Sequence, residues 1–536
     1  MKKYWVPLIV GVSMAVGMIV GSVYTVRHKV LTTYEQMAGF RTSSDNKISE
    51  MLRLIDDVYV DSVVSDSISE AILPLIVKQL DPHSAYIPAA DLEAVNEQLE
   101  GSFSGIGVQF SLQNDTVYVV DVISGGPSER AGLLDGDRIV EVNDTAFVGN
   151  QINNEKVMKK LRGPKGSKVR LGVVRRNTSE LLHFDITRGD IPVHSVDVAY
   201  MVTPTTGYIA VNKFGANTYN EFLTALAKLK KAHARNVVVD LRGNAGGYMD
   251  AALNMLNEFL SNNDLMVYVE GRSYPREESR ANGYGSAQNM KIAVLIDEWS
   301  ASASEIFAGA IQDNDRGIIV GRRSFGKGLV QNQMEFNDGS AVRLTVARYY
   351  TPAGRCIQKP YERGKAEDYE TDLLNRYLHG EFFSQDSIRQ SDTIIYRTKG
   401  GREVHGGGGI MPDIFVPRDT TGVSPYFNRL VNGSHLYRFA LDYSERHRTR
   451  LTKFADWQSL VAYLQQQNLY DQVVDYATKK GISGSESDKQ VSRTLILRHV
   501  TSYIVRNILG DDGFFPYINS YDDMVNRAVQ ELEKRH

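Results

Sequence analysis

The chain has 536 residues but only one cysteine, Cys356. A single cysteine excludes an internal disulfide and any zinc or iron–sulfur site built from several cysteines. Proline is also sparse, and the 15 prolines and 45 glycines are too few for a collagen-like or mostly disordered chain. The sequence therefore predicts a folded protein, and at roughly 150 residues per domain its length indicates three or four domains.

An excess of charge of either sign is absent as well. The 61 basic and 64 acidic side chains leave a formal net charge of −3. Proteins that bind nucleic acid usually carry a basic excess or a basic stripe, so we expect no nucleic-acid partner. Metal-binding motifs such as H-E-x-x-H or paired C-x-x-C are also missing, so no metal and no other cofactor are expected.

Residues 4–26 form one long uncharged run, preceded by Lys2 and Lys3 and closed by Arg27. A helix needs about 20 apolar residues to span a bilayer. The stretch Gly21–Tyr24 is a poor signal-peptidase site, which favours a retained anchor over a cleaved signal. A single-pass membrane protein is therefore expected, with most of the chain outside the cytoplasmic membrane.

The remaining chain divides into four regions of different character, which predicts an α/β multidomain protein. Strands and helices alternate in the longest region, as in a sheet covered by helices, and the expected strands include the apolar runs 237–241 and 292–296. The expected regions are a membrane anchor (1–30), a helical segment (31–100), a β-rich module (101–190), an α/β domain (191–418) and a mostly helical extension (419–536).

Two motifs in the β-rich module, residues 104–110 and 126–139, resemble a PDZ domain of the bacterial protease type. A glycine-flanked loop exposes backbone N–H groups that can hold a terminal carboxylate, and the following strand edge can pair with a peptide. The residues expected to make these contacts are Gly105, Ile106, Gly107 and Val108. The alternative is that the glycines only permit a tight turn.

Three stretches of the α/β domain carry candidate chemistry, namely residues 240–247, 300–310 and 324–331. Each is predicted to lie at a loop or at a helix start, where backbone N–H groups are free to face an anion. A serine hydroxyl becomes a good nucleophile only when a base takes its proton, and a lysine can be that base if burial lowers its pKa. Residues 300–310 and 324–331 contain several serines and one lysine, Lys327, that could fill these two roles.

These three stretches occur along the chain in a set order with residues 80–86 and 406–413. The same order is typical of the carboxyl-terminal processing proteases, which the chain resembles. These are tail-specific serine peptidases of peptidase family S41, with a PDZ domain and a crotonase-like (ClpP/crotonase) catalytic fold. The resemblance covers roughly residues 45 to 417. It implies an endopeptidase that needs no cofactor, acts on proteins with free C-terminal tails, and has its catalytic part on the periplasmic or extracytoplasmic side of a bacterial-type inner membrane.

The same resemblance implies the roles of individual residues. Ser302 would be the nucleophile, Lys327, 25 positions later, the general base, and Gln331, four positions after the lysine, its support. The backbone N–H of Ala303, with one from Gly246 or Gly247, would form the oxyanion hole.

Several alternatives stay open. Ser302 and Glu305 also form an S-x-x-E capping box. Asp240 and Arg242 fit either a catalytic carboxylate and clamp or an ion pair that shapes the glycine turn.

A Ser-His hydrolase of small esters would use His83 or His405. A membrane-tethered PDZ scaffold with an inactive protease domain is the rival from another class. The extension carries no motif and could cap the core, mediate homo-oligomerisation or bind an adaptor.

The stretch 321–327 nearly matches a phosphate-binding loop. However, Gly328 stands where that motif needs serine or threonine, and residues 329–336 are expected to form a strand. We therefore reject nucleotide binding.

Overall fold

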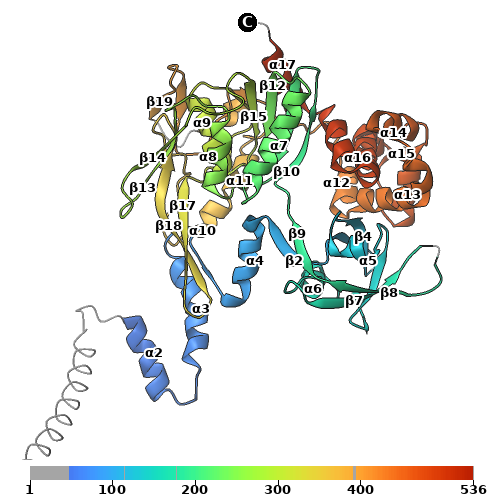
Figure 1. The fold of residues 1–536 in the computed structure, drawn as a ribbon, viewed down its shortest axis with the longest axis horizontal. Coiled ribbons are helices and arrows are strands. Elements are labelled where there is room, and N and C mark those ends of the chain that lie inside the picture. The colour runs from blue at the N-terminus through green and yellow to red at the C-terminus, as the bar shows by residue number, and fades with distance from the viewer. Residues whose placement is uncertain (1–46, 114, 177, 390–393, 535–536) are drawn as a thin grey trace, which may run out of the picture. The chain divides into compact units, whose positions relative to one another are not determined.

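The computed structural model describes residues 47–113, 115–176, 178–389 and 394–534 (Figure 1). The span predicted at residues 4–26 lies outside these ranges. Within them, no helix has both the length and the apolar character needed to cross a membrane. The chain divides into two compact units, residues 1–76 and 77–536, and each is described by itself.

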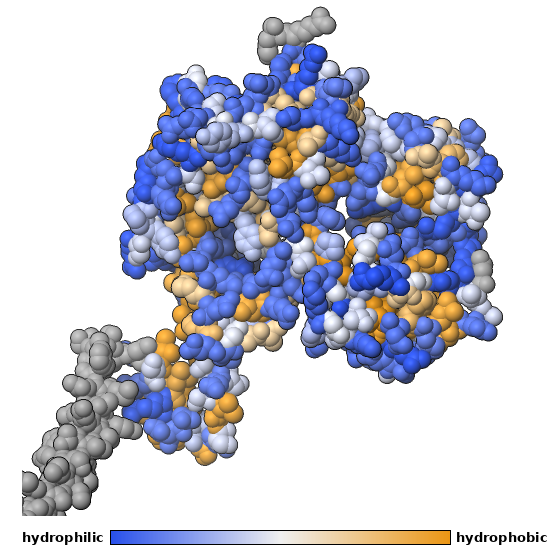
Figure 2. All heavy atoms as spheres, in the orientation of Figure 1, coloured by the Kyte–Doolittle hydropathy of each residue, from blue (hydrophilic) through white to orange (hydrophobic). Residues whose placement is uncertain are grey.

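The described part of the first unit consists of α2 (Lys47–Val58) and most of α3 (Ser65–Val77). None of the residues of α2 is buried. Several of its apolar side chains are exposed, and Figure 2 shows hydrophobic surface over both helices. The exposed large apolar residues of α2 are Ile48, Met51, Leu54 and Val58.

A six-stranded sheet forms the centre of the second unit, in the order β10-β11-β12-β15-β16-β21. Strands β11, β12, β15, β16 and β21 are parallel to one another, and β10 is antiparallel to β11. The bounds are β10 (Val196–Met201), β11 (Thr206–Val211), β12 (Asn236–Asp240), β15 (Lys291–Ile296), β16 (Ile318–Gly321) and β21 (Ile414–Phe415).

Helices cover both faces of this sheet, which explains why its strands are continuous apolar runs rather than alternating ones. Every residue of β11 and β12 is buried. Helices α7 (Thr218–Lys231), α8 (Met249–Asn257) and α9 (Ala303–Asp313) pack on one face. The other face is covered by α17 (Asp523–Glu533), from the far end of the chain.

A second sheet is antiparallel and runs β1-β18-β13-β14, with β17 also paired to β18. Strand β1 lies within the segment that the sequence predicted as helical, yet it pairs with β18 beside the catalytic region. The bounds are β1 (Ala85–Ile87), β13 (Leu265–Glu270), β14 (Glu277–Arg280), β17 (Leu329–Glu335) and β18 (Ala341–Tyr350).

The β-rich module follows α4 (Ala89–Glu100) and forms a sheet in the order β3-β4-β5-β7-β8, with β6 paired to β5. Strands β2 and β9 form a separate pair. The bounds are β2 (Ser102–Gly105), β3 (Val108–Gln113), β4 (Thr116–Val122), α5 (Pro127–Ala131), β5 (Arg138–Val142), β6 (Thr145–Ala146), α6 (Asn154–Leu161), β7 (Lys168–Val174), β8 (Leu182–Thr187) and β9 (Gly189–Pro192).

Apart from β21, the described residues between β18 and the C-terminal helices form only short elements. They are α10 (Ala366–Glu370), α11 (Asp372–Leu378), the 3₁₀ turn η1 (Gln385–Ser387), β19 (Ile395–Arg397) and β20 (Glu403–His405). The C-terminal region has its own apolar core, built from α12 (Pro425–Asn432), α13 (His435–Leu451), α14 (Trp457–Leu464), α15 (Leu469–Lys479) and α16 (Glu486–Asn519).

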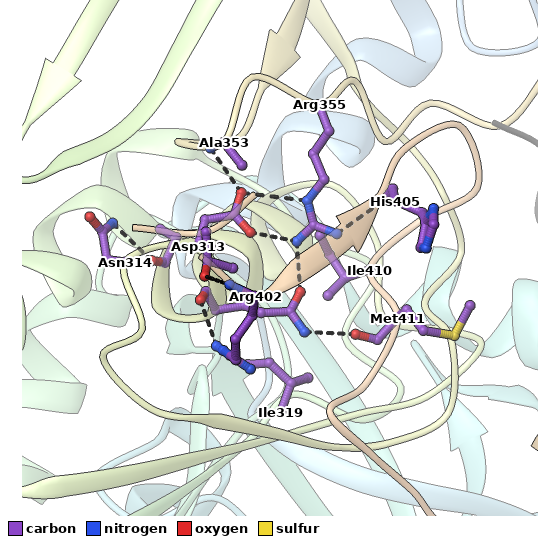
Figure 3. Close-up of polar contacts among 12 residues, drawn as sticks. Asp313, Asn314, Ile319, Ala353, Arg355, Arg402, His405, Ile410 and Met411 are labelled. Atoms are coloured by element: carbon purple, nitrogen blue, oxygen red, sulfur yellow. Dashed lines mark hydrogen bonds and ion pairs between the residues drawn. The ribbon is translucent and has the colours of Figure 1, made fainter. Parts of the chain in front are cut away.

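A buried ion pair between Arg355 and Asp313 fixes the C-terminal end of α9 (Figure 3). Both side chains are 0% exposed, and their nearest charged atoms are 2.7 Å apart. The guanidinium also donates to the carbonyl oxygen of His405, and Gln312 donates to the carbonyl of Met411. This network attaches residues 405–411 to the helix whose other end carries Ser302.

Candidate active site

Ser302 occupies the N-cap of α9, directly after the loop that leaves β15. Its backbone has φ 56° and ψ −114°, a combination that L-residues rarely adopt. Such strain is common where a fold holds a functional side chain in place. Nothing in the local sequence pattern indicates this backbone conformation.

Glu305 holds the backbones of Ser302 and Lys327 side by side. One carboxylate oxygen, Oε2, accepts the N–H groups of both residues at 2.8 Å. The other oxygen accepts from the Ser324 hydroxyl at 2.5 Å and from the Gly326 N–H at 2.7 Å. The side chain is fully buried, and burial raises the pKa of Glu305 to about 7, although the four donors oppose that shift.

Tyr349 makes the complementary contact from β18. Its buried hydroxyl lies within hydrogen-bond distance of the carbonyl oxygens of Ser302 and Lys327. Glu305 therefore links the backbones of the candidate nucleophile and base through their N–H groups, and Tyr349 links them through their carbonyl groups. This role of Tyr349 was not predicted from the sequence, and Glu305 was predicted only as part of a capping box.

Ser302, Lys327 and Gln331 line one cavity of about 450 Å³. No carboxylate is among its lining residues in the described part of the chain, whereas two cations, Lys327 and Arg343, are. Burial lowers the pKa of Lys327, and the positive charge of Arg343 lowers it further. The negative charges of Glu305 and Asp81 oppose this change.

Gln331 comes from β17 and bridges the lysine to a distant segment. Its Oε1 accepts from the Lys327 ammonium at 3.1 Å, while its Nε2 donates to the carbonyl oxygen of His83 at 2.5 Å. The structure thus brings together the three residues that the resemblance implied.

The glycine turn after β12 lies beside Ser302. A Cβ on Gly246 would come within 2.7 Å of the Ser302 Cβ. The Gly246 N–H donates to the side chain of Asn244 at 2.9 Å. Within the described chain, the N–H groups of Gly247 and Ala303 have no hydrogen-bond acceptor, and both residues line the cavity.

Asp240 and Arg242 form the turn-shaping ion pair, with Arg242 Nη2 and Asp240 Oδ2 2.6 Å apart. Arg242 also contacts Asp522, just before α17, at 2.7 Å. Neither side chain lines the cavity of Ser302; both line a separate cavity of about 610 Å³.

Neither candidate histidine lines the cavity of Ser302. The ring of His83 pairs with the hydroxyl of Tyr369, with 2.7 Å between Nε2 and the oxygen. Burial, with the charge of Lys327, lowers the pKa of His83 to about 4. His405 belongs to the network at the opposite end of α9 from Ser302 (Figure 3).

The predicted peptide-binding loop joins β2 to β3. Gly107 has φ +77°, and a Cβ there would lie 3.0 Å from Ile191, so the loop needs glycine at this position. Ile106 is 3% exposed and belongs to the core of the module, while Val108 begins β3. Strand β3 stands at the edge of the described sheet, with β4 as its only neighbour.

Family models match three parts of the chain. Residues 205–371 match peptidase family S41, residues 104–186 match the PDZ domain, and residues 426–510 match a family of unknown function, DUF8443.

The chain is similar to two probable CtpA-like serine proteases. It is 33% identical to one from Staphylococcus epidermidis over 341 residues, which is 63% of this chain and 68% of that protein. It is 35% identical to one from Staphylococcus aureus over 314 residues, which is 58% of this chain and 62% of that protein.

Two solved structures are also similar. The photosystem II D1 C-terminal processing protease is 25% identical, with 69% of this chain and 92% of that chain covered and a TM-score of 0.35. The PDZ domain of a carboxy-terminal protease from Vibrio cholerae, in complex with a peptide, is 29% identical; the match covers 17% of this chain and 99% of that one, with a TM-score of 0.16.

The S41 and PDZ matches, with the covered sheet and the helical C-terminal region, define a multidomain α/β serine peptidase that carries a PDZ domain. The chain belongs to peptidase family S41, with the CtpA-like serine proteases. The predictions of the family, the fold class and serine peptidase activity are confirmed, and the fold is consistent with the crotonase-like class.

Proposed function

We propose that this protein is an endopeptidase that binds proteins by their C-terminal tails and cleaves them through an acyl-enzyme on Ser302. Lys327 takes the proton of the Ser302 hydroxyl and later returns it to the leaving amine. The observation that carries this proposal is the shared Glu305 oxygen, which holds the N–H groups of both residues at 2.8 Å at the wall of one cavity.

The state of Lys327 supports its role as base. A lysine can take a proton only when it is neutral, and an exposed lysine is almost fully protonated near pH 7. Burial beside the cationic Arg343 lowers the pKa of Lys327, which increases the neutral fraction. Gln331 orients the amine by accepting one of its N–H groups.

The oxyanion hole in this proposal is formed by the N–H groups of Ala303 and Gly247. Gly246 is the weaker of the two glycine candidates because its N–H already donates to Asn244. Donors that are fixed in place before the reaction stabilise the developing oxyanion, and the loss of one typically costs about 10² to 10³ in rate.

Tail recognition is proposed for the loop at Gly105–Val108. The glycine loop and the edge strand β3 fit a peptide that adds as a strand and places its carboxylate against backbone N–H groups. We also propose that residues 4–26 anchor the protein in a bacterial-type inner membrane with the peptidase on the extracytoplasmic side. The helical extension is a candidate surface for homo-oligomerisation or an adaptor.

The test is proteolysis of an unstructured protein with a free C-terminus by the full chain and by Ser302→Ala and Lys327→Ala. We expect both variants to lose activity while keeping their thermal unfolding midpoint. The nucleophile and the base act in the same step, so removing either one should abolish nearly all of the catalysis. Near-normal turnover by Lys327→Ala at pH 7 to 8 would contradict a lysine base. Complete inactivity of the unaltered chain would instead favour the rival, a PDZ scaffold without catalysis.

A further inference from the structure

A turn far from the catalytic residues in sequence, Asp81–Ser84, contacts the support of the base. It lies before the PDZ domain, whereas Gln331 follows that domain by more than a hundred residues. The turn meets Gln331 through a hydrogen bond from the Gln331 amide to the carbonyl oxygen of His83. Its importance for the reaction rests on the function proposed for Lys327 and Gln331.

The carboxylate of Asp81 organises the turn. Its Oδ1 accepts the N–H groups of His83 and Ser84, both at 2.9 Å, and its Oδ2 accepts the Ser84 hydroxyl at 2.5 Å. The side chain is 7% exposed. Burial alone would raise the pKa of Asp81, but these donors outweigh it and lower the pKa, which keeps the carboxylate ionised.

The turn is fixed to the sheet that lines the cavity. The Thr345 hydroxyl donates to Asp81 Oδ1 at 3.0 Å, and the Thr345 N–H donates to the Ser84 hydroxyl at 3.0 Å. Strand β1 follows at once and pairs with β18 from Ala85 opposite Arg343. The backbone around the His83 carbonyl is therefore held by the Thr345 hydrogen bonds to Asp81 and Ser84 and by the pairing of β1 with β18.

A carbonyl oxygen can only accept a hydrogen bond, so it selects one orientation of the Gln331 amide. The amide nitrogen must face His83, and the amide oxygen must then face Lys327, as observed. If the amide were reversed, its N–H groups would face the N–H groups of the lysine. The His83 ring contributes from the other side through its 2.7 Å contact with Tyr369.

We propose that the Asp81–Ser84 turn is a positioning element for the general base, which acts by fixing the orientation of the Gln331 amide. Asp81 is then a positioning residue, and its effect on the reaction passes through Gln331. The catalytic site is incomplete without this segment, although it lies outside the S41 and PDZ matches.

The first experiment compares Asp81→Asn, Gln331→Ala and the double variant in the full chain. For each protein, kcat, KM and the pH profile of kcat are measured with a fluorescence-quenched peptide substrate. The asparagine amide has one acceptor oxygen fewer than the carboxylate, so the substitution releases the turn. A displacement of about 1 Å can cost 10² in rate, so we expect both single variants to lower kcat by roughly tenfold to a hundredfold with KM nearly unchanged. The double variant should be no slower than Gln331→Ala.

The double variant also separates positioning from charge. Lys327 faces Arg343 from β18, Glu305 from α9, and Asp81 with His83 from the turn. The charge of Asp81 by itself raises the pKa of Lys327, so its loss would move the acid limb of the profile to lower pH in any background. Positioning, by contrast, predicts that the loss of kcat by Asp81→Asn disappears once Gln331 is alanine.

Asp338→Asn is the matched control, because Asp338 accepts the N–H and hydroxyl of Ser340 in a similar turn on the same sheet. Ser84→Ala is the second variant, in case Asp81→Asn does not fold: it keeps the charge, removes the 2.5 Å and 3.0 Å bonds of the hydroxyl, and should lower kcat by a smaller factor.

Two results would overturn this inference and leave the proposed function standing. The first is a normal kcat in Asp81→Asn and Ser84→Ala while Gln331→Ala is slow. The second is a double variant in which the two losses of kcat multiply. Normal kcat in Gln331→Ala would overturn the proposed role of that glutamine and this inference with it. Equal loss in Asp338→Asn would show general damage to the sheet and would also overturn it.

Discussion

Replacing Gly247 with alanine should remove one oxyanion donor while leaving the nucleophile and base in place. A Cβ at this position would lie 2.0 Å from the carbonyl oxygen of Phe214 and 2.7 Å from its carbonyl carbon, and φ is +140°. Phe214 is tied to the turn by backbone bonds with Gly246 and Tyr248, so it cannot move aside as a flexible side chain could. The turn must shift, and the Gly247 N–H shifts with it.

The expected loss in kcat is about 10² to 10³, the usual cost of one oxyanion donor. KM should change little, since the donor acts on charge that develops only in the transition state. Gly243→Ala is the control in the same turn: it has φ +70°, and its Cβ would meet no atom of the described residues within 4 Å. It should cost about 1 to 2 kcal/mol of backbone strain and change kcat by no more than a few-fold.

The assay is steady-state cleavage of one peptide by both variants, with thermal unfolding of each measured alongside. A Gly247→Ala variant with kcat near the wild-type value would refute the assignment of its N–H to the oxyanion hole. Equal losses in Gly247→Ala and Gly243→Ala would refute it as well, because the effect would then follow turn strain rather than the donor.

Three further predictions concern the base, the tail and the membrane. Arg343→Gln should raise the pKa of Lys327 and move the acid limb of the kcat/KM pH profile to higher pH, because the Arg343 charge lowers that pKa. Arg348→Gln, on the same strand, is the control and should leave the acid limb unchanged. An acid limb that does not move in Arg343→Gln would contradict the electrostatic effect of Arg343 on Lys327. Amidation of a peptide's C-terminus should weaken its binding to the inactive Ser302→Ala chain by roughly ten- to a hundredfold, and equal affinities would show that the PDZ domain does not read C-termini. The full-length protein should remain in the membrane pellet after alkaline carbonate extraction, whereas a soluble form beginning near residue 25 would indicate cleavage.

Local patterns in the sequence predicted the strands of the parallel sheet well. The apolar runs at 237–241 and 292–296 became β12 and β15 with shifts of one residue, because strands covered on both faces need apolar side chains throughout. The family resemblance implied one site shared by Ser302 and Lys327, and both residues line one cavity.

Contacts between distant segments could not be predicted in this way. The three-residue strand β1 is too short for a periodic signal and exists because β18 offers it an edge. Glu305 was recognisable as a cap for its own helix, but its bonds to Gly326 and Lys327 depend on how a later loop folds back. Likewise, α17 has an ordinary amphipathic pattern that does not reveal which surface it covers.

The most direct test of the proposed mechanism is to locate and time the covalent adduct formed with a fluorophosphonate, by mass spectrometry of the full chain and of Lys327→Ala at pH 8. A serine activated by a lysine should carry the adduct at Ser302, and removal of the base should slow its formation by at least about 100-fold. An adduct at another residue, or equal rates in the two proteins, would contradict Ser302 and Lys327 as nucleophile and base.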